Sequence, residues 1–179
     1  MAEILIRPAV SPDIEHLSRF DHSVRTSKVW QMNQNIGDAE IRTGFKETAL
    51  PREMRIKYPR SPRTLLNRWK DFSSVLVGCI DQAPIGYITI STMFAPEMVW
   101  IKDLVVQGQW RKKGIATTLI RAAIDWGVAR KIFRMTIEMS SKNHPAISLV
   151  KKLGFEYSGF NDTYFMNNDL AVFFVRFIR

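Results

Sequence analysis

The chain has 179 residues, of which 46% are hydrophobic and 24% are charged, so the sequence predicts one folded domain with its own core. Its 26 Lys and Arg exceed its 17 Asp and Glu, and the net charge of +9 favours anionic partners without choosing among them. The single cysteine, Cys79, excludes an internal disulfide, there is no Cys/His cluster for zinc, and no apolar run approaches the ~18 residues of a membrane span. The N-terminus does not read as a signal peptide, so we expect a cytoplasmic protein without a metal site and with Cys79 buried.

The first part of the chain predicts a strand, a helix and an unusual arm. Residues 3–9 (EILIRPA) read as a short strand, and Ser11 and Pro12 predict the cap and first position of a helix. From about residue 26 to residue 60, apolar side chains alternate with polar ones, which is typical of half-buried strands. We expect a protruding two-stranded arm there, turning near residues 47–53 (ETALPRE).

The rest of the chain has a clearer pattern. Residues 61–72 predict a capped short helix or a linker. Six strand-like segments follow: SVLVGCI, APIGYITISTM, EMVWIKDLVV, FRMTIEM, FEYSGF and LAVFFVRFI. Helices are expected from about Gly114 to Arg130 and over NHPAISLVKKL, where Asn143 is the cap and Gly154 the end. Short loops predict antiparallel neighbours, so we expect an α/β (α+β) fold: a central, mixed, mostly antiparallel twisted sheet with helices on both faces.

The stretch RKKGIATT, residues 111–118, connects a strand to a helix. The first turn of a helix has unpaired backbone N–H groups and a partial positive charge, and both favour a bound anion. Arg111, Lys112 and Lys113 add charge, and Gly114 lets an anion come close to the backbone. Cations at this end oppose the helix dipole, so a purely structural helix gains nothing from them. We predict an anion site, with a solvated helix end or a nucleic-acid patch as alternatives; the Walker and dinucleotide-binding patterns are absent.

Two motifs carry a family resemblance. RKKGIA fits the pattern Arg/Gln-x-x-Gly-x-Gly/Ala directly after the strand IKDLVV, and NHPAISLVKKLGF resembles Asn-x-x-Ala followed at a set distance by Gly-Phe. Together they resemble the GNAT superfamily of acetyl-CoA-dependent N-acetyltransferases, over roughly residues 75–177. The resemblance implies a single GNAT domain over residues 1–179, with the arm at about 26–60 as an insertion. It also implies acetyl-CoA as co-substrate and direct acetyl transfer to a primary amine of a small-molecule or peptide acceptor.

The same resemblance implies donor-site residues. The loop would hold the pyrophosphate of coenzyme A, mostly through backbone N–H groups; its residues are Arg111, Lys112, Lys113, Gly114, Ile115, Ala116 and, as a helper, Thr117. The strand segment Leu104, Val105 and Val106 would offer backbone groups to the pantetheine arm and the acetyl carbonyl, as though the co-substrate were an extra strand. Asn143 would touch the pantetheine or adenosine end.

The catalytic residues are less clear, because the chain departs from the family pattern. Many members carry a tyrosine that protonates the leaving thiolate, and Val150 stands at that position here. Either the thiolate leaves unaided, which a thiol pKa of ~8.5 allows, or Tyr164 in NDTYF replaces the missing acid. Glu138 is the first candidate for the general base, by a spacing that resembles ribosomal-protein alanine acetyltransferases. Asp103 and Glu97 are alternatives.

Other functions stay open at this point. A non-catalytic acyl-CoA sensor would explain Val150. A nucleic-acid-binding module would explain the basic stretch from Arg42 to Lys70, although neither nucleic acid nor a membrane is the expected main partner; this stretch contains Arg52, Arg55, Lys57, Tyr58, Arg60, Arg63, Arg68 and Trp69. The arm would either cover the acceptor or pair with a second subunit as a homodimer. The three histidines, His16, His22 and His144, do not cluster, and we interpret His144 as structural.

Overall fold

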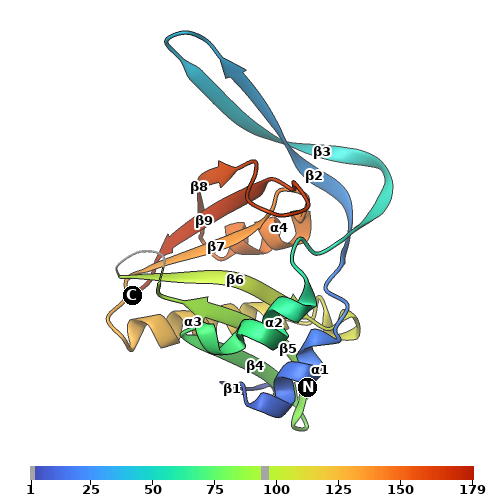
Figure 1. The fold of residues 1–179 in the computed structure, drawn as a ribbon, viewed down its shortest axis with the longest axis vertical. Helices are drawn as coiled ribbons and strands as arrows, with labels where there is room; N and C mark the ends of the chain where they lie inside the picture. The colour runs from blue at the N-terminus through green and yellow to red at the C-terminus, as the bar shows by residue number, and fades with distance from the viewer. Residues whose placement is uncertain (1–2, 94–96) are drawn as a thin grey trace.

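The computed structural model describes residues 3–93 and 97–179, which form a seven-stranded sheet and a separate two-stranded sheet (Figure 1). The strand order of the large sheet is β1-β4-β5-β6-β7-β9-β8. The strands are β1 (Leu5–Pro8), β2 (Val24–Ile36), β3 (Ile41–Ile56), β4 (Ser74–Ile80), β5 (Ala83–Ser91), β6 (Met98–Val106), β7 (Arg134–Ser140), β8 (Glu156–Asn161) and β9 (Ala171–Phe177). The helices are α1 (Ser11–Ser18), α2 (Pro62–Arg68), α3 (Ile115–Val128) and α4 (His144–Lys152), with short 3-10 turns at Trp69–Asp71 and Gly108–Trp110.

Helices cover both faces of the large sheet, as the sequence predicted. Alternate residues of a strand point to opposite faces. In β4, Val75 and Val77 pack with α1 and α2, whereas Leu76 and Ile80 pack with α3 and α4. Cys79 belongs to the α1/α2 side and is fully buried, as expected.

The centre of the sheet holds a parallel pair that separates along its length. Of the strand pairs in the described residues, only β6 and β7 run parallel, and their pairing joins Met98–Ile101 to Arg134–Ile137. Both strands continue beyond these residues, β6 to Val106 and β7 to Ser140, and diverge as they do so (Figure 1). The last five residues of β6 therefore have no strand beside them on the β7 side.

The arm exists, but it turns at a different place from the one predicted. Strands β2 and β3 pair from Val24↔Ile56 to Ile36↔Ile41, and the turn is closed by a hydrogen bond from the Gly37 N–H to the Glu40 carbonyl, 2.8 Å. Residues 47–53 lie within β3 instead. The register jumps from Lys28↔Ala49 to Thr26↔Met54, so residues 50–53 form a bulge that resembles a turn in the sequence.

Helix starts follow the sequence with one correction. Ser11 is the first residue of α1 rather than its cap, because Asp13 accepts the Val10 N–H at 2.8 Å and thereby caps the helix. Ser61 caps α2 through the Arg63 N–H. The structure thus confirms a helix within residues 61–72.

No helix among the described residues is long and apolar enough to cross a membrane. Within the same residues, no three His, Cys, Asp or Glu side chains come together in a way that could hold a metal ion.

Candidate active site

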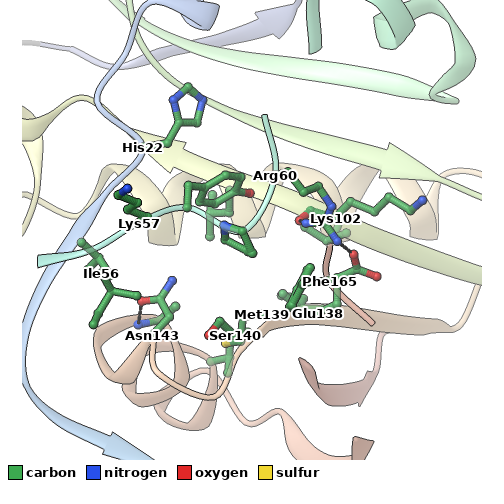
Figure 2. Close-up of a pocket in the computed structure, with 18 residues that line it drawn as sticks. His22, Ile56, Lys57, Arg60, Lys102, Glu138, Met139, Ser140, Asn143 and Phe165 are labelled. Atoms are coloured by element: carbon green, nitrogen blue, oxygen red, sulfur yellow. Dashed lines mark hydrogen bonds and ion pairs between the residues drawn. The ribbon is translucent and has the colours of Figure 1, made fainter. Parts of the chain in front are cut away.

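A pocket lies where β6 and β7 diverge (Figure 2). One wall comes from the two strands, a second from the roots of the arm and the segment after it, and a third from the start of α4. The lining residues are His22, Val24, Ile56, Lys57, Tyr58, Pro59, Arg60, Ile101, Lys102, Leu104, Ile137, Glu138, Met139, Ser140, Asn143, Ala146, Val150 and Phe165. The pocket therefore reaches both faces of the sheet, so two reactants could enter from opposite sides.

The β6 edge offers backbone groups to this gap. The Gln107 N–H bonds to the Ile85 carbonyl of the β5 side, 2.9 Å. Because backbone groups alternate along an antiparallel strand, those of Leu104 and Val106 point the other way, toward the gap. The Val106 carbonyl already accepts from Arg111 Nε at 2.8 Å. The backbone groups that remain for a bound ligand are therefore the N–H of Val106 and the N–H and carbonyl of Leu104. The side chain of Val105 is buried on the α1/α2 side.

The loop before α3 has the backbone shape of an anion site. Lys112 and Gly114 both adopt left-handed conformations, with φ of 62° and 86°, and a Cβ at Gly114 would meet nothing within 4 Å. Gly114 is the N-cap residue of α3 and has no side chain that could cap the helix. The first backbone N–H groups of α3 therefore have no side-chain acceptor. Ile115 is buried in the core and fixes the helix start, while Ala116 and Thr117 are partly buried.

The cations of this loop differ in what they do. The Arg111 guanidinium donates to the carbonyls of Ser23 and Asp21, both at 2.6 Å, and burial lowers its pKa. Its side chain therefore ties the loop to the segment before the arm. The Lys113 ammonium lies over the Trp110 ring at 4.6 Å, and Lys112 is exposed.

Glu138 is the most heavily bonded side chain of the pocket. Its side chain has no exposed area, and it pairs with the guanidinium of Arg60, whose side chain is 18% exposed. Tyr164 donates its hydroxyl to Glu138 Oε2 at 2.6 Å, and Trp100 Nε1 donates to the same oxygen. Glu138 lies inside β7, two residues before its end, so it is a buried carboxylate rather than a solvated strand end: Oε2 accepts both hydrogen bonds, and Oε1 has the Arg60 ion pair without a hydrogen bond.

Asp103 forms the second half of this acidic cluster. It accepts from the Tyr58 hydroxyl at 2.5 Å and from Thr89 at 3.3 Å, and Arg60 Nη1 lies 3.6 Å away. Arg60 also donates to the Lys102 carbonyl at 2.9 Å. A single arginine thus joins two buried acids from neighbouring strands, as Figure 2 shows for Glu138.

Burial shifts the pKa values of the titrating groups around the cluster, in each case in the direction that favours the neutral form. It raises the pKa of Tyr164 and places that of Tyr58 well above its usual value. It lowers the pKa of His22, whose Nε2 meets the Tyr87 hydroxyl at 2.9 Å and whose Nδ1 meets the Phe20 carbonyl at 2.7 Å. A neutral His22 with its proton on Nδ1 satisfies both contacts, because a carbonyl can only accept.

The remaining candidates separate into pocket residues and others. Val150 is buried and lines the pocket, so it packs there. Asn143 caps α4 by accepting the Ala146 N–H at 3.3 Å and also lines the pocket. Glu97 lies in the turn before β6, exposed and outside the pocket lining. His144 bonds Glu47 of the arm at 2.8 Å, which agrees with the structural interpretation.

Arg60 and Trp100 were not singled out as site residues by the sequence. Arg60 appeared only as one cation of a basic stretch. Its partners, Asp103 and Glu138, are 43 and 78 positions further along the chain, so no local sequence pattern predicts these ion pairs. Other cations of that stretch are also paired: Arg55 bonds Asp21 at 2.9 Å and Arg68 bonds Asp71 at 2.8 Å. Three cations of the basic stretch, Arg55, Arg60 and Arg68, are therefore paired with acids of the chain itself.

Comparison with known proteins agrees with this geometry. The model of the acetyltransferase (GNAT) family matches residues 45–155, and the chain belongs to this family. The L-amino acid N-acetyltransferase AaaT of Escherichia coli (strain K12) is 31% identical over 99 residues, which are 52% of this chain and 59% of that relative. The match thus spans less than two thirds of the curated relative.

Two solved structures resemble the whole chain in fold. A nourseothricin acetyltransferase has a TM-score of 0.84 at 18% identity and covers 98% of this chain and 99% of its own. A protein of Bacillus anthracis str. Ames, named provisionally as a streptothricin acetyltransferase and solved with acetyl coenzyme A, has a TM-score of 0.76 at 17% identity and covers 99% of both chains.

Proposed function

We propose that this chain transfers the acetyl group of acetyl-CoA directly to a primary amine. The observation that carries the proposal is the gap that opens where the pairing of β6 with β7 ends, with Glu138 and Arg60 in its lining and the uncapped start of α3 following β6 in the chain. Coenzyme A is a polyanion on an extended amide arm, so it fits a helix mouth at one end and an open strand edge at the other. Membership of the GNAT family supports the same donor.

The proposed reaction needs no covalent enzyme intermediate. The neutral amine nitrogen attacks the thioester carbonyl, a C–N bond forms, the C–S bond breaks, and the sulfur leaves as a thiolate. The amine nitrogen loses one proton and the thiolate can accept one. Cys79 is buried away from the pocket, which supports direct attack.

We assign the proton for the thiolate to Tyr164. A tyrosine hydroxyl, with an ordinary pKa of ~10, is protonated at neutral pH and can donate, whereas Val150 has no proton to give. Glu138 holds that hydroxyl at 2.6 Å. Because the Glu138 side chain has no exposed area, we infer that it positions Tyr164 and Arg60 rather than taking a proton directly from the acceptor.

A site without an exposed strong base suits an acceptor that loses its proton readily. An α-amine, with a pKa of ~7.7–8.0, must overcome about 1.4 kcal/mol at pH 7, whereas a lysine-like amine, with a pKa of ~10.4, must overcome about 4.6 kcal/mol. We therefore propose an α-amine acceptor. The relative named as an L-amino acid N-acetyltransferase is consistent with this choice.

The test is a panel of amines incubated with acetyl-CoA and the purified protein. Mass spectrometry of the acetylated product is the readout, since it does not respond to the protein's own thiol. The panel contains L-amino acids, short peptides with a free or blocked N-terminus, and nourseothricin. The proposal predicts product with α-amines and none with blocked peptides. Acetylation of nourseothricin alone would overturn the α-amine assignment, and no product with any amine would overturn the enzyme assignment.

A further inference from the structure

The arm has one apolar and one polar face. The register pairs Met32 with Phe45 and Ile36 with Ile41, and Trp30 lies two positions before Met32. Because alternate strand residues point to one side, these five side chains share a face, on which the hydrogen-bonded pair Gln34 and Thr43 separates the apolar residues of the tip from the others. The opposite face carries exposed polar side chains at Gln31, Asn33, Asn35, Arg42 and Lys46. The alternation that predicted the arm is thus the signature of an amphipathic ribbon.

At its base, the apolar face is covered by the chain's own body. Trp30 and Phe45 are partly buried and pack against the main core. The Phe45 ring lies 5.5 Å from the ring of Tyr157 and 5.6 Å from that of Phe160. The apolar face is therefore built to pack against something.

At the tip, the same face is bare. Ile36 and Ile41 are each 68% exposed, and they flank the turn at the far end of the ribbon, which projects from the body (Figure 1). A two-stranded ribbon is marginally stable in water on its own. A pair of isoleucines at the tip of such a ribbon is better explained by a contact than by exposure.

The base of the arm also borders an open apolar cavity. It has a volume of about 550 Å³ and lies between the arm and the body beside β8 and β9. Most of its wall is aromatic or aliphatic, including Trp30, Phe45, Phe155, Tyr157, Val172 and Phe174. The wall also carries one cation and one acid, Lys151 and Glu156, and Lys151 lies over the Trp30 ring at 4.7 Å.

We propose that two copies of this chain form a symmetric dimer in which the arm tip of each copy, Ile36 and Ile41, fills the cavity at the base of the partner's arm. Tip and cavity lie on one face of one ribbon, and Ile41 is four residues from Phe45, or about 14 Å along the strand. Two ribbons stacked antiparallel about a twofold axis therefore place both tips over both bases at once.

A second copy of the chain accounts for both the exposed isoleucines of the tip and the open cavity, without any other partner. The arm's roots, Val24 and Ile56, line the candidate active site, so the dimer contact would also brace one wall of that pocket. The inference does not depend on acetyl transfer and can be tested without it.

The first test compares variants of the two faces by sedimentation equilibrium across a concentration series. Ile36→Asp/Ile41→Asp changes the tip, and Asn35→Asp/Arg42→Gln makes the same change in net charge on the opposite face. The wild type and the control should have twice the 20.7 kDa mass of one chain, and the tip variant should associate at least about a hundredfold more weakly. A monomeric wild type, or equal weakening by both variants, would overturn the proposal.

The second test fixes the geometry by disulfide trapping. Ile41→Cys combined with Tyr157→Cys should give an interchain disulfide under mild oxidation, while the buried Cys79 stays unreactive. Within one chain Ile41 is about 14 Å beyond the residue that contacts Tyr157, too far for a disulfide. Mixed single-cysteine proteins should give a crosslinked heterodimer. A protein that dimerises but gives no such crosslink would refute the tip-to-base arrangement.

Discussion

Removing Arg60 tests whether the acidic cluster is as tightly coupled as its geometry indicates. Glu138 has no exposed side-chain area and Arg60 has 18%, so Arg60→Met leaves two buried acids without their shared cation. Breaking a buried pair from one side costs about 3–5 kcal/mol. For a domain of this size, 1 kcal/mol corresponds to roughly 2–4 °C, so the melting temperature should fall by roughly 6–20 °C.

The assay is urea denaturation and thermal melting with a matched control. Arg68 pairs with Asp71 at the surface, where the two side chains are 69% and 56% exposed, so Arg68→Met should cost about 0–1 kcal/mol. Adding Glu138→Gln to Arg60→Met removes the more deeply buried of the two stranded charges, and the double variant should be more stable than Arg60→Met alone. An Arg60→Met protein as stable as Arg68→Met would refute the cluster as described.

Three further changes give sharp expectations. Because the pKa of His22 is lowered in the folded state, unfolding takes up a proton below about pH 6.5, and the free energy of unfolding should decrease as the pH falls, by up to about 1.4 kcal/mol per pH unit. In urea titrations at several pH values, His22→Gln should show a shallower pH dependence than the wild type. An unchanged slope would contradict this expectation. A Cβ at Gly86 would lie 2.9 Å from the Val105 carbonyl, so Gly86→Ala should cost about 1–3 kcal/mol in denaturation, whereas Gly108→Ala, which meets nothing within 4 Å, should not. Tyr164→Phe should lower turnover about a hundredfold with acetyl-CoA affinity unchanged; an equal loss of affinity would argue against a role as the acid.

The helices near the pocket were predictable because their signals are local. A helix over residues 143–153 with Asn143 as its cap was expected, and α4 covers His144–Lys152 with that cap. Similarly, α3 begins one residue after Gly114. Capping side chains and a glycine with positive φ act within one turn, so they can be read without knowing the rest of the fold.

The arm's turn was misplaced because a bulge and a turn share the same residues. Pro51 interrupts an alternating run and suggests a turn, but in a two-stranded ribbon a proline is tolerated where pairing lapses. Residues 50–53 are such a lapse. The real turn at Gly37–Glu40 lies within the stretch of residues 26–60 and contains no proline to mark it.

The acidic cluster could not be predicted, because its members come from three separate segments. Arg60 follows the arm, Asp103 and Trp100 lie on β6, and Glu138 lies on β7. Each residue alone is an ordinary charged or aromatic residue, and only the divergence of β6 from β7 creates the pocket that they share. The hydrogen bonds of Arg111 to the segment before the arm could not be predicted for a related reason, since its acceptors lie about ninety positions earlier in the chain.

The most direct test of the central claim is calorimetric binding of acetyl-CoA to the wild type, Gly114→Asn and Gly114→Asp. Gly114 has a φ of 86°, which asparagine tolerates better than most residues, so Gly114→Asn controls for backbone strain. Gly114→Asp adds a carboxylate at nearly the same size. The account predicts binding by the wild type at about micromolar concentration, and at least about tenfold weaker binding by Gly114→Asp than by Gly114→Asn. Equal binding by the two variants, or no binding by the folded wild type, would contradict the loop's assignment as the site of the pyrophosphate.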